Sequence, residues 1–128
     1  MDGDAFSRAQ EHLAHGRTQE AEAALTQLLP ANPGVAELHA SLGMIAGSTG
    51  RHALAAQRLE RACELDPQQA VYWHNCGEAL RLTSRLQDAE RAFRRAIAID
   101  PEFIAPYDSL IVVVQIAHGR ALAASDAA

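Results

Sequence analysis

Three prolines set a fixed period along this chain of 128 residues, because Pro33, Pro67 and Pro101 follow one another at intervals of 34 residues. Other positions between the prolines recur at the same interval. They include Ala21, Ala55 and Ala89; Leu25, Leu59 and Phe93; and Arg17, Arg51 and Arg85. A period of this length, repeated at several independent positions, predicts stacked copies of one supersecondary unit.

Each unit divides into two helical segments. A small residue before arginine interrupts the helical pattern at Gly16, Gly50 and Ser84, and it permits the chain to reverse there. An Asn-Pro or Asp-Pro pair ends the second segment, because the residue before proline disfavours the helical conformation. The sequence therefore predicts an all-α chain of about seven helices, over residues 3–15, 19–31, 35–48, 52–65, 69–82, 86–99 and 103–117.

Apolar residues at helical spacing indicate how these helices pack. Ala55 is small enough to let two antiparallel helices approach closely, and Leu59 follows four residues later on the same face. The other two units have equivalent residues. One helix pair cannot bury all its apolar surface alone, so neighbouring pairs are expected to stack into a solenoid.

Composition limits the function. The formal net charge is −5 and there is no lysine, which argues against nucleic-acid binding, since that requires clustered positive charge. The first residues do not resemble a signal peptide, and no apolar run is long enough to span a bilayer. We therefore expect a soluble, cytoplasmic protein without membrane insertion.

The residues that most often perform chemistry are not arranged for it. Cys63 and Cys76 lie in apolar helical segments without a CxxC pair, which predicts buried free thiols in a reducing compartment rather than a disulfide or a metal pair. His12 and His15 share a helix face, but no further ligand has an obvious place beside them. The sequence contains no P-loop, GxGxxG, GxSxG or HExxH motif. We expect no catalytic, cofactor or metal site, and a protein that is not an enzyme.

With these features the chain resembles the tetratricopeptide repeat family. Residues 69–102 match the family pattern best, at Trp73, Gly77, Ala89, Phe93 and Pro101. Cys76 replaces the usual leucine, and His39 replaces the tryptophan of the preceding unit. The resemblance implies a right-handed superhelical solenoid of antiparallel helix pairs. We expect three repeats and a capping helix or incomplete fourth repeat, over residues 2–34, 35–68, 69–102 and 103–128.

The resemblance also implies where a partner binds. In this family the concave face is lined by the first helix of each unit, and it binds a peptide or helix of another protein. The residues expected there by register are Gln10, Glu37, Ser41, Met44, His74, Asn75, Glu78, Arg81 and Asp108. The function expected from this surface is a protein–protein interaction module, acting as an adaptor, scaffold or co-chaperone.

Two known uses of the groove do not fit these residues. Family members that clamp the C-terminal carboxylate of heat-shock chaperones need lysine, asparagine and arginine at defined places. This chain has no base at those places, which are Phe6, Gln10, Ser41, Val71 and Asn75. Some glycosyltransferases have a ladder of asparagines along the groove, and in this chain only Asn75 corresponds to it. An alternative function is the repeat region of a larger bacterial enzyme, such as a sulfotransferase or glycosyltransferase.

The last predicted helix offers a second surface. By register, Tyr107, Leu110, Ile111 and Val114 are expected to pack on the third unit. Val112, Val113 and Ile116 then point elsewhere, and an uncovered apolar stripe is typical of an interface. A homodimer, a larger partner or a downstream domain would cover this stripe, or residues 119–128 would fold back over it after a turn at 118–120. Self-assembly through this stripe is a further alternative function.

Overall fold

The computed structural model describes residues 1–127. They contain seven α-helices and one short 3-10 helix, η1 (Leu29–Ala31), joined by short turns. The α-helices are α1 (Gly3–Ala14), α2 (Thr18–Leu28), α3 (Ala36–Ser48), α4 (His52–Leu65), α5 (Ala70–Leu82), α6 (Leu86–Ile99) and α7 (Ala105–Ala127). The all-α solenoid predicted from the period is confirmed.

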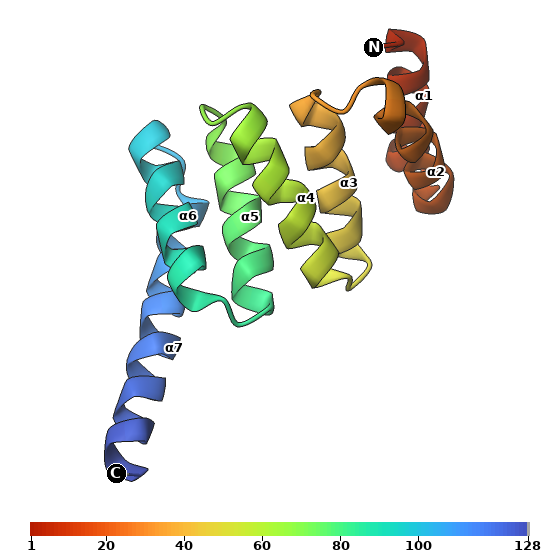
Figure 1. The fold of residues 1–128 in the computed structure, drawn as a ribbon. Helices are drawn as coiled ribbons and strands as arrows, with labels where there is room; N and C mark the ends of the chain where they lie inside the picture. The colour runs from red at the N-terminus through yellow and green to blue at the C-terminus, as the bar shows by residue number, and fades with distance from the viewer. Residues whose placement is uncertain (128) are drawn as a thin grey trace.

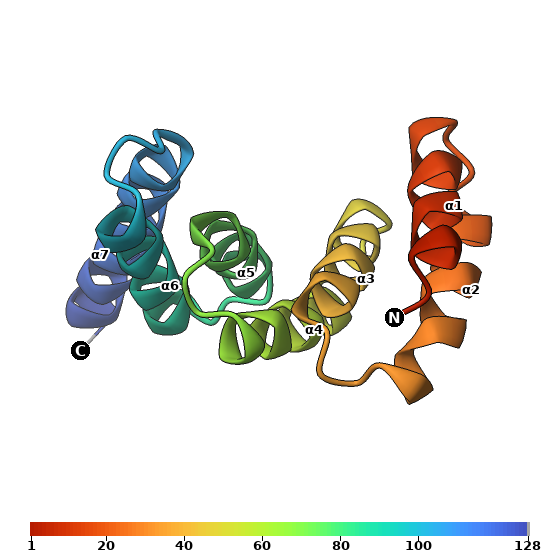
Figure 2. The ribbon, with the colours of Figure 1, turned by 90° about the horizontal axis from the view of Figure 1, so that it is seen from above.

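Consecutive helices form antiparallel pairs that stack side by side from the N-terminus to the C-terminus (Figure 1). Seen from above, the pairs follow an arc, with α3 and α5 on its inner side and α4 and α6 on its outer side (Figure 2). The contact between α4 and α5 is more extensive than the contact between α2 and α3. The first pair is therefore joined to the stack less tightly than the second and third pairs are to each other.

The turn inside each pair has one conformation in all three places. Gly16 and Gly50 have φ angles of 72° and 80°, and Ser84 has a φ of 62°. The following arginine then donates its backbone N–H back across the turn, as Arg85 does to the Leu80 carbonyl at 2.9 Å. This bond gives a carbonyl in the last turn of the helix a backbone donor from beyond the helix end. Glycine suits the left-handed conformation, whereas serine adopts it at a cost.

A second repeated hydrogen bond fixes the connection between pairs. Trp73 Nε1 donates to the Pro67 carbonyl at 2.9 Å, and the Tyr107 hydroxyl donates to the Pro101 carbonyl at 2.8 Å. His39 stands at the same place in the second pair, and its Nε2 lies 2.8 Å from the Pro33 carbonyl. Three different side chains therefore make one contact, which holds the proline turn against the helix that follows.

Close approach within each pair accounts for the small residues of the repeat. Ala55 and Ala89 are fully buried, as are the apolar side chains that follow them. Gly43 faces Leu59, and Gly77 faces Phe93. A Cβ added to these glycines would lie 2.7 Å from Leu59 Cγ and 2.6 Å from Phe93 Cε1. The side chain of the second helix therefore rests on the backbone of the first.

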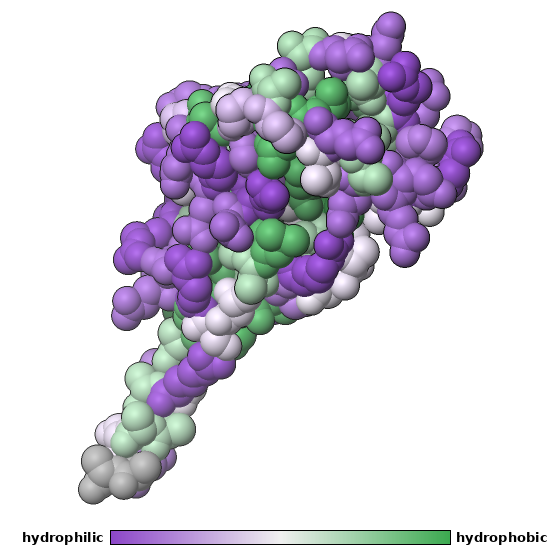
Figure 3. Space-filling model, turned by 45° about the vertical axis from the view of Figure 1, so that its right-hand side comes forward, coloured by the Kyte–Doolittle hydropathy of each residue, from purple (hydrophilic) through white to green (hydrophobic). Residues whose placement is uncertain are grey.

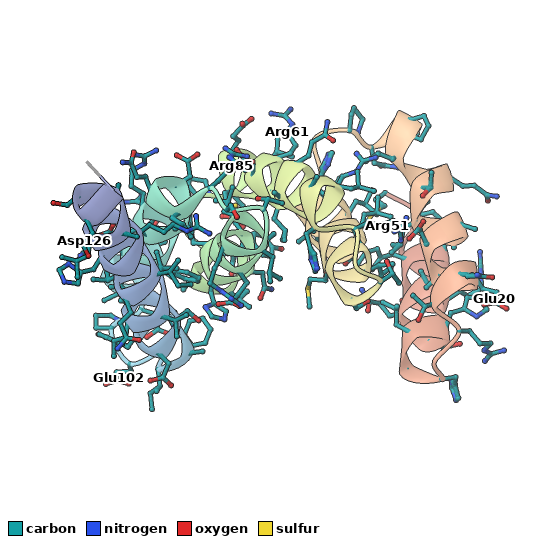
Figure 4. The ribbon with its side chains drawn as sticks, turned by 90° about the horizontal axis from the view of Figure 1, so that it is seen from below. Glu20, Arg51, Arg61, Arg85, Glu102 and Asp126 are labelled. Atoms are coloured by element: carbon teal, nitrogen blue, oxygen red, sulfur yellow. The ribbon has the colours of Figure 1, made fainter. Side chains whose placement is uncertain are left out.

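Ion pairs on the outer side connect successive pairs. Arg51 at the start of α4 bonds to Glu22 of α2, and Arg85 at the start of α6 bonds to Glu60 of α4 with an N–O distance of 2.8 Å. Figure 4 shows Arg51 between the first and second pairs, and Arg85 beside α4 on the outer side. Exposed ion pairs of this kind contribute little to stability because water screens them, so the apolar core remains its main source.

The end of the last helix differs from the prediction. The turn expected at residues 118–120 does not form, because α7 continues as one helix to Ala127 and does not fold back. Glycine within a helix costs about 1 kcal/mol, and the alanine-rich segment after Gly119 has the highest helix propensity. Gly119 therefore lies inside a helix, and the turn predicted from it is wrong. The second half of α7 projects from the body as a single rod (Figures 1 and 3).

The turn conformation leads to a prediction for Ser84→Gly. The left-handed conformation costs serine about 1–2 kcal/mol of conformational free energy, which glycine does not lose. Glycine is also more flexible in the unfolded chain, and this entropy offsets part of the gain. We expect Ser84→Gly to raise the free energy of unfolding by about 0.5–1 kcal/mol in urea denaturation. The reciprocal Gly50→Ser should lower it by a similar amount. Destabilisation by Ser84→Gly would contradict this explanation.

The contact between Gly77 and Phe93 gives a second prediction. Gly77→Ala places a methyl group where the Phe93 ring already lies, so the two helices must move apart. Overpacking of this kind costs about 1–3 kcal/mol, which thermal and urea denaturation would detect. Gly34→Ala is the matched control, because nothing lies within 4 Å of its added Cβ. Equal stability of the two variants would mean that the close approach is not important.

Candidate binding groove

The inner side of the arc is formed by the first helix of each pair (Figure 2). Residues one period apart recur on this side, as Met44, Glu78 and Val112 do on α3, α5 and α7. Three of the large apolar side chains that the structure leaves exposed belong to this side, namely Met44 at 54%, Leu82 at 49% and Val112 at 42%. The inner face therefore carries exposed apolar side chains on α3, α5 and α7, with the acidic Glu78 between them.

A pocket of about 270 Å³ lies between α3 and α5. Met44 and Ser48 contribute from α3, and Asn75, Glu78 and Leu82 contribute from α5. Buried residues at the start and middle of α4 form its floor, Ala55 and Leu59 among them. The structure thus brings together Met44, Asn75 and Glu78, three of the residues that the sequence assigned to the groove.

Glu78 is an acidic group fixed in place at the centre of this face. Its carboxylate accepts a hydrogen bond from Arg81 at 2.9 Å, and both side chains are about two-thirds buried. Burial raises the pKa of Glu78, but hydrogen bonding by Ser109 and Arg81 and the nearby positive charges outweigh it, so the pKa lies below its ordinary value. The carboxylate therefore stays ionised near pH 7. Arg81 is therefore not a free cation for a partner, because Glu78 occupies it.

His74 is packed more deeply than a simple groove contact. Its ring centroid lies 5.3 Å from that of Phe103 in an edge-to-face arrangement, and 5.6 Å from that of Phe93. Burial lowers the pKa of His74, and the charge of Glu78 opposes this only in part. The imidazole is therefore neutral near pH 7. It fills the space between α5, α6 and the turn before α7, beneath the surface that a partner would touch.

Four other residues assigned to the groove lie farther from the pocket. Gln10 is exposed on α1, Glu37 is exposed in the first turn of α3, and Asp108 is exposed in the first turn of α7. Ser41 is half-buried on α3. Their register supports the assignment, but no contact brings them to the pocket between α3 and α5, so their part in binding stays a prediction.

The assignment of a self-association stripe needs a correction. Val113, which was expected to be uncovered, is fully buried, and Ile116 is half-buried. Ile111 and Val114, which were expected to pack on the third unit, are 55% and 42% exposed. In α3 and α5 the positions of Ile111 and Val114 pack on the second helix of the same pair. In α7 this face is exposed in the described structure, whereas Val113 packs into the core cluster together with residues of α5 and α6.

Sequence reasoning missed a pocket of about 460 Å³ on the outer side of the solenoid. Its lining includes Cys63 of α4, Cys76 of α5 and Ala92 of α6, with Arg91 and Arg95 at its edge. Both cysteines are buried free thiols, as predicted. Hydrogen bonding to Cys63, together with burial, raises the pKa of the Cys76 thiol. No sequence motif marks this pocket, because it forms between helices of two different units.

Among residues 1–127, no three side chains of histidine, cysteine, aspartate or glutamate gather in a way that would hold a metal ion. No helix in the described part of the chain is long and apolar enough to cross a membrane.

Comparison with known families gives one result over most of the chain. Models described as tetratricopeptide repeats match residues 6–70 and residues 70–103. No curated protein matches the sequence significantly.

Solved structures with a similar fold include binding domains and one enzyme. The first repeat domain of Spaghetti (RPAP3), bound to the HSP90 peptide SRMEEVD, has a TM-score of 0.84 at 17% identity, over 89% of this chain and 90% of that one. The type III secretion translocator chaperone SycD of Yersinia enterocolitica has a TM-score of 0.81 at 19% identity, over 90% and 84%. These two identities support the fold alone.

An O-GlcNAc transferase mutant of Thermobaculum terrenum has a TM-score of 0.78 at 28% identity. The similarity covers 87% of this chain but 21% of that enzyme, so this chain corresponds to about a fifth of its length.

The environment of His74 predicts a pH dependence of stability. Its pKa in the folded chain lies below the ordinary 6.5, so below that pH the unfolded chain binds more protons and stability falls. We expect urea denaturation at about pH 7.5 and 5.5 to show a smaller loss for His74→Gln than for the original chain. An identical loss in the two proteins would contradict the assignment.

Proposed function

Because the chain belongs to the tetratricopeptide repeat family, we propose that it is a protein–protein interaction module whose inner groove binds a peptide or helix of a partner. The observation on which the proposal depends is the pocket between α3 and α5, where Met44 and Leu82 are both about half exposed. Aliphatic side chains left open at a concave site gain free energy when a partner covers them. An adaptor, a scaffold or a co-chaperone would use the groove in this way.

The charges of the groove indicate which peptides fit. Glu37, Glu78 and Asp108 give the inner face three acidic groups, and its arginine, Arg81, is already paired with Glu78. An acidic peptide would meet repulsion and find no free cation in the groove. We therefore propose a partner segment with two or more apolar side chains and a neutral or basic remainder. This differs from the acidic HSP90 peptide bound by the RPAP3 domain.

The two free cysteines bear on the cellular compartment of the protein. Cys63 and Cys76 remain free although both lie in the core. Paired cysteines are common in oxidising compartments and rare in the cytosol. We propose a reducing compartment such as the cytoplasm.

A second candidate is the repeat region of a larger enzyme. The 28% identity to the O-GlcNAc transferase of Thermobaculum terrenum favours it, as this chain would then correspond to a fifth of such a protein. Reading the coding sequence beyond Ala128 separates the two candidates. A catalytic domain in the same frame would replace the adaptor proposal, although the groove could still select the substrate protein.

Selection from a peptide library would test the groove directly. The immobilised chain is used to select displayed peptides, and the winners are measured by fluorescence polarisation. We expect apolar, non-acidic sequences that lose at least about tenfold in affinity with Met44→Glu or Leu82→Glu, which is about 1.4 kcal/mol of binding free energy.

Ala53→Glu, at an exposed position on α4, is the matched control and should bind as the original chain does. If Met44→Glu and Leu82→Glu bind the peptides as tightly as the original chain does, the binding site lies outside the groove. Enrichment of acidic peptides would contradict the charge argument while leaving the groove itself in place.

A further inference from the structure

One apolar face of α7 is open on the side away from the core. Tyr107, Ile111 and Val114 are 39%, 55% and 42% exposed, while Val113 on the opposite side is fully buried. This face is distinct from the groove, which Val112 borders from another side of the helix. We define the outer face of α7 as Tyr107, Ile111, Val114, His118, Ala121 and Ser125.

The residue at position 111 limits what can cover this face. Gly43 and Gly77 stand one and two periods before it, and each lies under an apolar side chain from the second helix of its own pair. Even a single Cβ at Gly77 would come within 2.6 Å of the Phe93 ring. Ile111 adds a whole branched side chain at that place. A helix packed on α7 as closely as α6 packs on α5 would therefore collide with it.

The spacing of the outer face suits a different kind of partner. Its six residues are separated alternately by four and three positions, which is the spacing of a two-helix coiled coil. Its large residues, Tyr107, Ile111 and Val114, lie in the first half of the face, and the small Ala121 and Ser125 lie in the second half. A surface graded in this way is complementary to its own antiparallel copy, because the two largest residues, Tyr107 and Ile111, each meet a smaller one.

The charge pattern agrees with self-recognition. No aspartate, glutamate or arginine occurs between Asp108 and Arg120, so the middle of α7 offers no charge for a polar partner. The second half of the helix projects alone from the body (Figure 3) and is exposed from Ala117 to Asp126. An isolated helical segment of this length is marginal in water. A second copy of α7 would cover both the apolar half and the projecting half at once.

We propose that a second copy of this chain binds the outer face of α7, with the two α7 helices antiparallel. In this arrangement Tyr107 lies against Ser125 of the second copy, Ile111 against Ala121, and Val114 against His118. The contact leaves the inner groove free, so each dimer would present two grooves. This proposal does not depend on what the groove binds.

Sedimentation equilibrium of the full chain tests the association. We expect a reversible dimer at concentrations up to about 100 µM, and a dissociation constant at least about tenfold higher for Ile111→Asp, since the interface would bury an unpaired charge. Val71→Asp is the matched control, because Val71 is also an exposed valine, at 45%, but lies on α5. Circular dichroism melts confirm that each variant is folded, and Val114→Asp provides a second disruption of the same face.

Cross-linking tests the antiparallel arrangement. Tyr107→Cys and Ser125→Cys are made separately, and each protein is oxidised alone and then in an equal mixture. We expect disulfide-linked dimers in the mixture only, and the native cysteines do not interfere because both are buried. A chain that stays monomeric, a dimer unaffected by Ile111→Asp and Val114→Asp, or cross-links in Ser125→Cys alone would each overturn the proposal.

Discussion

The close approach of the two helices in each pair is the constraint on which the rest of the structure depends. Gly43 and Gly77 let Leu59 and Phe93 rest on the backbone of the preceding helix, with no room for a Cβ between them. This contact sets the distance between the helices, and the hydrogen bonds to the proline carbonyls then set how one pair follows the next. The arc and its inner groove result from repeating these two contacts.

The same constraint explains why the array changes character at α7. Ile111 occupies the position that must be glycine for a tightly packed partner helix, so the packing of the earlier pairs cannot be repeated on α7. Val113 still packs on the third pair, which attaches the helix firmly to the stack. The result is a helix that belongs to the solenoid on one side and presents a surface of a different kind on the other.

Most of the fold could be predicted because its causes are local. The Asn-Pro and Asp-Pro pairs, Gly16 and Gly50 end helices through their own backbone preferences, and the period assigns the core positions by repetition. The errors came where neighbours decide the outcome. Gly119 has the composition of a turn but lies inside a helix, and Val113 is buried because α7 packs on the preceding pair. His74 was correctly placed on α5, but its contacts with Phe93 and Phe103 could not be read from spacing.

In this family a shared fold does not imply a shared ligand, because different residues determine the two. The positions that repeat every 34 residues are those that the packing of helix pairs requires, so they recur in any chain that folds this way. Met44, Leu82 and Val112 are exposed and take no part in that packing, hence nothing in the fold determines their identity. Binding preference is therefore encoded in the residues that the repeat leaves free. The acidic peptide bound by one structural neighbour does not transfer to a groove whose arginine is already paired with Glu78.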